Sequence, residues 1–417
     1  FAEVHLCFVT EGMFTSLTQM TALCGVGGSS AIPTFSNRVQ GRVTRVPKTQ
    51  AVKKTFKTVP VVSSSSSEDP LLLRVARGEQ GDRPPVWLMR QAGRYMSEFR
   101  EYSDKYGFRH RSETADIAIE LSLQPWRAFK PDGVIMFSDI LTPLPAIGVE
   151  FDVVKGKGPI ISNPVRTMED LNALKCLDDP DLSLPFIRQI LTSLRSEVNG
   201  KSTLLGFIGT PWTLAAYSVE GRSDRHLLIT KQIMNQNPEL LHQYLAHLSD
   251  VLTVYVCHQI DCGAQVVQLF DSWAHHLSPQ QFAEFSLPYS ERVIAAVKAK
   301  YPQTPLILHA NGGVGKLGIM KESAADVIGL DWSTDMAEAR MVFGPDRVLQ
   351  GNMDPMYLFA NEERIRREVA QNVAAAGNGK HILNVGHGVV QGTPEENVGI
   401  FCEAARKAAY NSTHEKA

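Results

Sequence analysis

Short apolar segments alternate with polar turns and helical patterns over most of the chain. Each apolar segment is four to six residues long, and turn residues and then the spacing of an amphipathic helix follow it. Eight such segments can be recognised: Pro85–Met89, Val134–Phe137, Leu204–Ile208, Gln265–Phe270, Leu306–His309, Val327–Asp331, Val348–Asn352 and Ile382–Val385. Continuous apolar runs of this length are typical of parallel strands buried on both faces. The pattern therefore predicts an α/β fold made of successive βα units.

Eight βα units favour a single (β/α)8 TIM barrel over an open doubly wound sheet, which usually has about five or six strands. The longest insertion follows the second strand, where residues 148–165 alternate like a β-hairpin with Gly156-Lys157-Gly158 as its turn. Two helix starts, Ser278-Pro279-Gln280-Gln281 and Thr393-Pro394-Glu395-Glu396, have the sequence of a capping box with proline at the first helical position. We predict one catalytic barrel domain over residues 69–417.

A segment of different composition precedes the predicted barrel. Residues 13–67 contain no Asp or Glu but seven Lys and Arg, with abundant Ser and Thr, and this is the composition of a transit peptide. The segment ends in a run of serines at residues 63–67, which cannot bury enough apolar surface to become ordered. We therefore expect residues 1–68 to be a disordered organelle leader. Residues 1–12 are a candidate for non-native or upstream sequence, with Met13 as the start.

Charge and cysteine content narrow the class of protein. The formal net charge is −2, so no overall field attracts nucleic acid or an anionic membrane, and any attraction to an anion must be local. The six cysteines are too scattered for a disulfide framework, which fits a reducing compartment. No apolar run approaches the roughly 18 to 20 residues that span a bilayer. We expect the mature protein to be soluble.

Polar residues follow the ends of the predicted strands. The first strand continues into Arg90-Gln91-Ala92-Gly93-Arg94, the second into Ser138-Asp139, and the fourth into Asp271-Ser272. The third leads into a helix that carries Tyr217, and the eighth ends at His387. Because the active site of a TIM barrel lies at the carboxyl ends of its strands, these side chains predict a catalytic mouth.

Two arginines and one aspartate are the sharpest candidates. Arg90 and Arg94 are four residues apart, so on one helical turn they would share a face, and each can bind a carboxylate with two hydrogen bonds. The alternative is that they pair with Glu98 or Glu101 on the same segment. Asp139 follows an apolar strand, where a carboxylate needs hydrogen-bond donors or a cation, and an ordinary ion pair with Arg90 is the alternative there.

The histidines and Tyr217 have competing interpretations. His309, Asp331, Asp354 and His387 follow strands, but no two of them have metal-ligand spacing on one element, so no metal is expected. His275-His276 is more typical of a solvent contact or a subunit interface than of a ligand pair. The glycines at 386 and 388 would let the ring of His387 lie close to a ligand. Tyr217 is either a site residue or core packing with a bonded hydroxyl.

At these residues the chain resembles the uroporphyrinogen decarboxylase family. The two signature segments of the family are matched by Pro85-Val86-Trp87-Leu88-Met89-Arg90-Gln91-Ala92-Gly93-Arg94-Tyr95 and Gly209-Thr210-Pro211-Trp212-Thr213-Leu214. Further matches, in the order of the family, are Phe137-Ser138-Asp139-Ile140-Leu141, Leu269-Phe270-Asp271-Ser272, Gly329-Leu330-Asp331-Trp332, Gly351-Asn352-Met353-Asp354-Pro355 and Gly386-His387-Gly388. The resemblance covers nearly the whole predicted barrel domain.

The resemblance implies a fold and an activity. The family is a (β/α)8 barrel that works as a homodimer without metal or coenzyme, and it removes the four acetate carboxyl groups of uroporphyrinogen III to give coproporphyrinogen III. This reaction serves both heme and chlorophyll synthesis. With the leader, the resemblance implies a plant enzyme of the chloroplast stroma, with a tetrapyrrole as its substrate and no nucleic acid or membrane partner.

The resemblance also implies residue roles. Asp139 would accept hydrogen bonds from the pyrrole NH groups and stabilise positive charge on the ring. Arg90 and Arg94 would hold the acetate and propionate carboxylates, within a substrate-binding segment that includes Gln91, Ala92 and Gly93. Tyr217, Ser272 and His387 would add hydrogen bonds, and Phe270 would pack against the macrocycle. Asp139, Arg90, Tyr217 and His387 are thus the catalytic candidates. Arg90 has a pKa above about 12 and is a poor acid, so the proton donor stays open.

Two other classes of function remain as alternatives. A cobalamin-linked methyltransferase of the same superfamily would bind zinc through a His-x-Cys pair after the fifth strand, but this chain has His309-Ala310-Asn311 there and no thiol. A porphyrinogen carrier without turnover would keep the arginines and dispense with Asp139, which is present. His275, His276 and His309 are not expected across the family, and the sequence assigns them no role.

Overall fold

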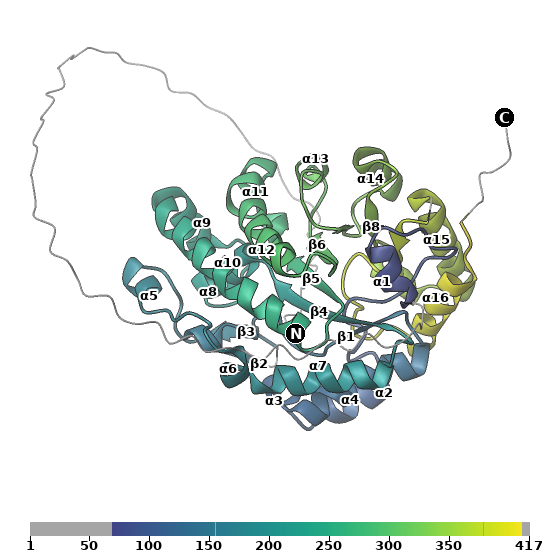
Figure 1. Cartoon of the computed structure of the whole chain (residues 1–417), viewed down its shortest axis with the longest axis horizontal. Helices are drawn as coiled ribbons and strands as arrows, with labels where there is room; N and C mark the ends of the chain where they lie inside the picture. The colour runs from purple at the N-terminus through teal and green to yellow at the C-terminus, as the bar shows by residue number, and fades with distance from the viewer. Residues whose placement is uncertain (1–68, 155, 378, 411–417) are drawn as a thin grey trace, which may run out of the picture. The chain divides into compact units, whose positions relative to one another are not determined.

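The computed structural model describes residues 69–154, 156–377 and 379–410, so the predicted leader, residues 1–68, and residues 411–417 of the predicted domain lie outside the described residues. Seven parallel strands form one curled sheet at the centre of the described part, in the order β1-β4-β5-β6-β7-β8-β9 (Figure 1). They are β1 (Gly133–Ile135), β4 (Thr203–Gly209), β5 (Val266–Asp271), β6 (Leu306–Ala310), β7 (Val327–Gly329), β8 (Val348–Gln350) and β9 (His381–Ile382). They overlap seven of the eight predicted segments.

The sheet is the core of the molecule. Except for Phe270, every residue of these seven strands is buried, as expected for strands that pack on both faces. Two buried glutamines on the sheet are hydrogen-bonded to each other. Gln350 on β8 accepts from Trp87 Nε1 at 2.9 Å and donates to Gln268 on β5 at 2.8 Å. These bonds tie the segment around Trp87 to two strands of the sheet.

The segment Pro85–Met89 is not a regular strand, which corrects the sequence prediction. It forms one isolated parallel bridge, between Val86 and Leu383. On its other side, the backbone N–H of Asp132, just before β1, donates to Val86 O at 2.7 Å. A longer ladder cannot form, because Pro84 and Pro85 have no N–H and the N–H of Val86 bonds to the carboxylate of Asp132. The segment thus lies between the two end strands of the sheet.

A hairpin follows β1 in the chain. Strands β2 (Phe151–Val154) and β3 (Gly158–Ile161) pair antiparallel, with Phe151 opposite Ile161 and Val154 opposite Gly158. Gly156 and Gly158 have φ of 79° and 75°, a conformation that glycine adopts without steric cost. The hairpin lies within the segment 148–165 that alternates in the sequence.

Helices surround the outer side of the curled sheet (Figure 1). The α-helices are α1 (Leu71–Ala76), α2 (Ser97–Ser103), α3 (Phe108–Glu113), α4 (Ala115–Phe129), α5 (Met168–Asn172), α6 (Pro180–Ser183), α7 (Pro185–Val198), α8 (Pro211–Glu220), α9 (Leu228–Gln236), α10 (Pro238–Asp261), α11 (Pro279–Phe285), α12 (Leu287–Lys300), α13 (Leu317–Met320), α14 (Met336–Phe343), α15 (Glu362–Ala376) and α16 (Glu395–Lys407). Three short 3-10 helices are η1 (Pro145–Ile147), η2 (Ala274–His276) and η3 (Pro355–Phe359). Among the residues described, no helix combines the length and the apolar character needed to cross a membrane.

The two predicted capping boxes have different outcomes. Ser278 and Gln281 form a reciprocal capping box at the start of α11, which confirms the first. The second is wrong, because α16 begins at Glu395 with Pro394 as its N-cap and no side-chain cap. The hydroxyl of Thr393 is buried and instead donates to Val390 O at 2.8 Å. Tertiary burial therefore overrides the local capping sequence there.

Candidate active site

The candidate residues lie at the carboxyl ends of neighbouring strands or in the elements that follow them. Arg90 follows the Pro85–Met89 segment, Asp139 follows β1, Tyr217 lies on α8 after β4, Phe270 lies in β5, Ser272 follows it, and His387 follows β9. Since all seven strands run parallel, these ends are at the same edge of the sheet. The sequence therefore predicted candidates at one edge from five separate segments.

The segment from Arg90 to Arg94 is an irregular turn, so the predicted shared helical face is wrong. Helix α2 begins only at Ser97, and Arg90 has a φ of 58°, which is uncommon for a residue other than glycine. Such a conformation costs about 1–3 kcal/mol and persists at functional sites where the surroundings fix it. The buried Gln91 side chain donates to Gly133 O at 3.2 Å and accepts from Leu88 N at 3.4 Å. It anchors the turn to β1.

Arg94 is half-buried and held by residues farther along the segment. Its guanidinium donates to Ser103 Oγ at 3.0 Å and forms an ion pair with Asp104 at 3.3 Å. The ion pair is thus with Asp104 and not with Glu98 or Glu101. Ala92 is half-buried and Gly93 is buried, and a Cβ on Gly93 would lie 3.2 Å from Arg90 O. The segment is compact around its two arginines.

The glycines beside His387 make room for protein atoms rather than for a ligand. A Cβ on Gly388 would lie 2.3 Å from Cδ of Arg90, and a Cβ on Gly386 would lie 2.1 Å from the backbone N of Trp332. The side chain of Arg90 therefore lies directly against the backbone after His387. This contact brings the first and the last candidate segments of the chain together.

Asp139 is fixed by a network of short polar contacts. Its Oδ1 accepts from Leu141 N at 2.8 Å, and its backbone N–H donates to Thr142 Oγ1 at 3.3 Å. Thr142 Oγ1 also lies 3.0 Å from Ser138 Oγ. No hydrogen bond from a described residue reaches Oδ2 of Asp139. One carboxylate oxygen is therefore held in place by the backbone of the turn. Thr142 is a supporting residue that sequence analysis missed, and its position three residues after Asp139 is the only local signal.

Four of the candidates share one electrostatic environment. Burial raises the pKa of Asp139, opposed by the Leu141 N–H and by the charge of Arg90. Burial lowers the pKa of Arg90, opposed by Tyr217 and Asp139, although the Arg90 side chain is exposed to solvent. The Arg90 side chain thus reaches solvent at a place where many protein atoms surround it. Arg90 and Asp139, both described, influence each other's pKa but form no ion pair with each other within 4.0 Å.

Tyr217, His387 and Phe270 are three further candidates, and the first two interact electrostatically with Asp139 or Arg90. Burial and then Asp139 raise the pKa of Tyr217, whose ring packs edge-on against Trp273 at 5.2 Å. Burial and then Arg90 lower the pKa of His387 to about 4, so its ring is neutral at neutral pH. Phe270 packs edge-on against the ring of His309 at 5.9 Å. The candidates thus comprise a carboxylate, a guanidinium, two neutral polar groups and an aromatic ring.

Ser272 and the neighbouring histidines are in contact with one another. Ser272 O accepts from Nδ1 of His275 at 3.1 Å and from Asn311 at 3.3 Å. His275 and His276 lie on η2 with ring centroids 4.1 Å apart, and both rings pack against Trp273. His309 is buried, and within the described part of the chain its Nδ1 has no partner. The charges of His309 and His275 contribute to the lowered pKa of His387, so both rings lie close to the site.

Two of the strand-end residues weighed as metal ligands, Asp331 and Asp354, have structural partners. Asp331 accepts from Gly312 N, Ser333 Oγ and Thr334 Oγ1 at 2.6–2.9 Å, so its carboxylate organises the loop after β6. Asp354 caps η3 by accepting from Met356 N. Over residues 69–154, 156–377 and 379–410, no group of three or more His, Cys, Asp or Glu is placed to hold a metal ion. The zinc site of the methyltransferase alternative therefore has no ligand set there.

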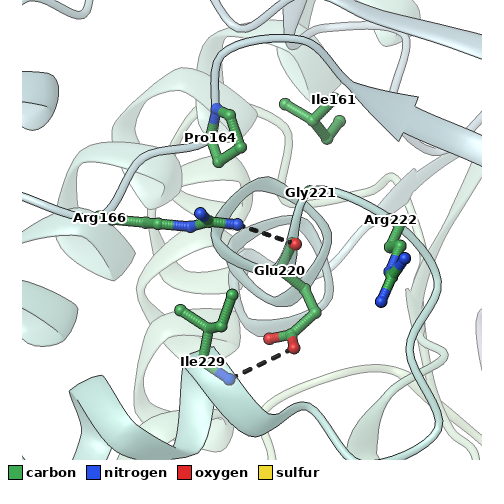
Figure 2. Close-up of a pocket in the computed structure, with 7 residues that line it drawn as sticks. All are labelled: Ile161, Pro164, Arg166, Glu220, Gly221, Arg222 and Ile229. Atoms are coloured by element: carbon green, nitrogen blue, oxygen red, sulfur yellow. Dashed lines mark hydrogen bonds between the residues drawn. The ribbon is translucent and has the colours of Figure 1, made fainter.

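A separate hollow of about 320 Å³ lies beside the hairpin (Figure 2). Two of its charged side chains, Arg166 and Glu220, form hydrogen bonds that join neighbouring elements of the fold. Arg166 donates to Glu220 O at 3.1 Å at the end of α8, and the carboxylate of Glu220 accepts from Ile229 N at 3.3 Å at the start of α9. The hollow includes none of the candidate residues described above, and we assign it a structural role.

The buried histidines give a pH-dependent stability. Burial lowers the pKa of His309 and of His381 to about 4, whereas in the unfolded chain it is near 6.5. Between these values the unfolded chain binds more protons, so the free energy of unfolding rises with pH through this window, by about 3 kcal/mol for each group. The contribution is complete above pH 6.5 and is lost as the pH falls to 4. We expect urea denaturation to show greater stability at pH 7 than at pH 5.

Two variants isolate these contributions. His309→Leu should flatten the rise in stability between pH 5 and 7. Burial raises the pKa of Asp271 to about 6, so ionisation of this group makes the free energy of unfolding fall as the pH rises. Asp271→Asn should therefore make the rise in stability between pH 5 and 7 steeper. Equal slopes in all three proteins would contradict the assignment of the pH dependence to these groups.

Comparison with known proteins places the chain in one family. Residues 67–408 match the family model described as uroporphyrinogen decarboxylase (URO-D). The uroporphyrinogen decarboxylase of Crocosphaera subtropica is 55% identical over 345 residues, which are 82% of this chain and 97% of the relative. That of Microcystis aeruginosa is 55% identical over 348 residues, or 83% of this chain and 99% of the relative. The solved structure of a methyltransferase from Methanosarcina mazei is 19% identical, with a TM-score of 0.69, and the match covers 81% of this chain and 99% of that one. At that identity the structural likeness concerns the fold alone.

Proposed function

The chain belongs to the uroporphyrinogen decarboxylase family, and we propose that it removes the four acetate carboxyl groups of uroporphyrinogen III, with Asp139 as the central catalytic group. It is thus a carboxy-lyase of tetrapyrrole biosynthesis. The observation that supports the assignment of the site is the carboxylate of Asp139, which has one oxygen fixed by Leu141 N and lies in the electrostatic field of Arg90. A carboxylate placed in this way suits a substrate that becomes positively charged.

The reaction needs an electron sink, and the substrate supplies it. A proton adds to the ring carbon next to the one that bears the acetate arm, and the ring becomes a cation conjugated to the arm-bearing carbon. The bond to the carboxylate carbon then breaks, carbon dioxide leaves, and the electron pair forms an exocyclic double bond that neutralises the ring. A second proton adds to the exocyclic carbon and gives a methyl group, and the ring carbon loses the first proton to restore the pyrrole. Asp139 lowers the barrier by stabilising the cation, and its desolvated position strengthens that attraction.

The other residues bind and orient. Arg90 and Arg94 hold carboxylate arms of the substrate, because a guanidinium binds a carboxylate with two parallel hydrogen bonds. His387 is neutral at neutral pH, and the pKa of Tyr217 is raised, so both act as hydrogen-bonding groups rather than as acids. Ser272 adds a hydroxyl and Phe270 an apolar face for the macrocycle. Gln91, Ala92 and Gly93 shape the turn between the two arginines.

The fold that this function requires is a closed (β/α)8 barrel over residues 69–417 with the hairpin inserted after its second strand. We infer that the segment Pro85–Met89 takes the place of the first strand. Its bonds to Leu383 on one side and to Asp132 on the other support this inference. The chain of bonds from Trp87 through Gln350 to Gln268 supports it as well.

A homodimer is part of the proposal. Val314, Trp332 and Met356 lie in the loops that follow β6, β7 and β8, and their side chains are 50–58% exposed. Apolar side chains gathered at one end of a barrel are typical of an interface. Light scattering of the purified protein should give twice the monomer mass, and a monomer at micromolar concentration would contradict this part of the proposal.

The leader supports delivery to the chloroplast stroma. Residues 13–67 have the acid-free, basic composition of a transit peptide, and the relatives named above are cyanobacterial proteins. A fluorescent protein carrying residues 13–68 at its amino terminus should accumulate inside isolated chloroplasts and lose the leader. A fusion that stays outside would contradict the localisation.

Anaerobic incubation with uroporphyrinogen III tests the function. Protein that begins at residue 69 should convert the substrate to a product with four fewer carboxyl groups, in the presence of a chelator and without added coenzyme. Chromatography of the oxidised products counts the carboxyl groups. Unchanged substrate would sink the proposal, and turnover that depended on added metal or coenzyme would show that the mechanism above is wrong.

A further inference from the structure

Arg111 on α3 is a buried arginine outside the residues discussed so far. Its side chain is 5% exposed, and its Nε donates to Tyr106 O at 3.2 Å. The guanidinium carbon lies over three aromatic rings, with centroids of Phe99, Phe108 and Phe137 at 5.3, 5.5 and 5.7 Å. These contacts stabilise the positive charge through the faces of the rings.

The rings do not satisfy the polar hydrogens of the group. Nη1 of Arg111 is shielded from solvent and has no hydrogen-bond partner among the described residues. An unsatisfied buried donor destabilises the folded chain, and more so when the group is charged. A chain that only needed a packing residue here would be more stable with an apolar side chain. The unpartnered donor therefore points to a ligand that arrives from outside the chain.

Arg111 lies next to the candidate active site. Phe137, which its guanidinium contacts, is two residues before Asp139. Burial and then repulsion by Arg94 lower the pKa of Arg111 to about 10, while Asp104 acts in the opposite direction. Asp104 also forms the ion pair with Arg94, and its side chain is 61% exposed. Arg94 and Arg111 thus share the single negative charge of Asp104. The three groups together carry a net positive charge, which favours the binding of an anion.

We propose that Arg111 is a further substrate-binding residue whose Nη1, together with Arg94, binds one carboxylate arm of the polycarboxylate substrate. The inference rests on the proposed function, since it needs a ligand with several carboxylates at this mouth. A bound carboxylate would satisfy the buried donor and balance the repulsion between the two arginines. Asp104 then acts as a competitor that occupies Arg94 in the absence of substrate.

The test compares Arg111→Lys with Arg109→Lys in steady-state assays. Lysine keeps the cation among the rings but lacks Nη1, so Arg111→Lys should raise KM at least about 10-fold, with kcat within about 3-fold, because a hydrogen bond to a charged group is lost. Arg109 lies on the same helix and over the Phe151 ring, but its partners are Glu113 and Phe151 O. Arg109→Lys should leave KM unchanged.

Several outcomes would overturn the inference. A KM for Arg111→Lys within twofold of the wild type, or an equal rise in Arg109→Lys, would show that Arg111 only supports α3. If Arg111→Lys does not fold, Asp104→Asn is measured instead. This variant removes the exposed carboxylate that pairs with Arg94, so its KM should be about 2- to 3-fold lower than that of the wild type. An unchanged or raised KM would refute the proposal. Failure of the wild-type protein to turn over uroporphyrinogen would instead refute the proposed function.

Discussion

Replacing Asp139 by asparagine is expected to lower kcat by about 100- to 1000-fold, the loss typical of removing one preorganised electrostatic group from an active site. Asparagine has nearly the same shape, so it can still accept from Leu141 N and keep the turn after β1. It removes the negative charge, which is the property that stabilises a cationic ring. The loss should therefore appear in kcat, while KM changes much less, because the ring is neutral in the ground state.

The measurement is steady-state decarboxylation with circular dichroism and thermal melting of the same samples. Asp152→Asn is a matched control, because Asp152 is an exposed aspartate on β2 whose Oδ1 accepts a backbone N–H in the same manner. The control should keep wild-type rates. A folded Asp139→Asn protein with near-normal kcat would mean that the positive charge is stabilised by another group or does not develop.

The hydrophobic pattern predicted the sheet because burial on both faces leaves a clear signal. Seven apolar runs coincide with strands whose residues are almost all buried. The remaining run, Pro85–Met89, forms no regular strand. Pro84 and Pro85 lack N–H groups, and the carboxylate of Asp132 accepts a hydrogen bond from the N–H of Val86. Spacing along the chain cannot reveal that a side chain 46 residues away replaces a strand partner.

The position of the candidate residues was predictable where it depended on the ends of strands and not where it depended on tertiary packing. Asp139 and His387 follow strands, and the parallel sheet brings them to one edge. The helical turn predicted for Arg90 and Arg94 does not form, since Arg90 adopts a positive φ that no local pattern signals. Arg111 lies in a charged stretch that looks solvated, and only the convergence of aromatic rings from α2, α3 and the end of β1 buries it.

Arg90→Ala is expected to raise KM by about 10- to 100-fold, because a charge-assisted contact to a substrate carboxylate is worth roughly 1.5–3 kcal/mol. Its effect on kcat should be smaller than that of Asp139→Asn, since the arm is bound alike before and during the loss of carbon dioxide. Arg90→Lys should fall between the wild type and Arg90→Ala, because lysine keeps the charge but not the two parallel hydrogen bonds. Initial rates over a range of uroporphyrinogen concentrations separate the two constants.

A second variant tests whether the position of Arg90 matters as well as its charge. In Gly388→Ala the new Cβ would lie 2.3 Å from Cδ of Arg90, so the guanidinium must move although it keeps its charge. Its KM should rise in the same direction as that of Arg90→Ala. Arg127→Ala is the matched control, because Arg127 is an exposed arginine paired with Glu120 on α4. If Arg90→Ala and Gly388→Ala both keep the wild-type KM, then the arginine at the end of the first segment does not bind the substrate, and the carboxylate arms must be held elsewhere.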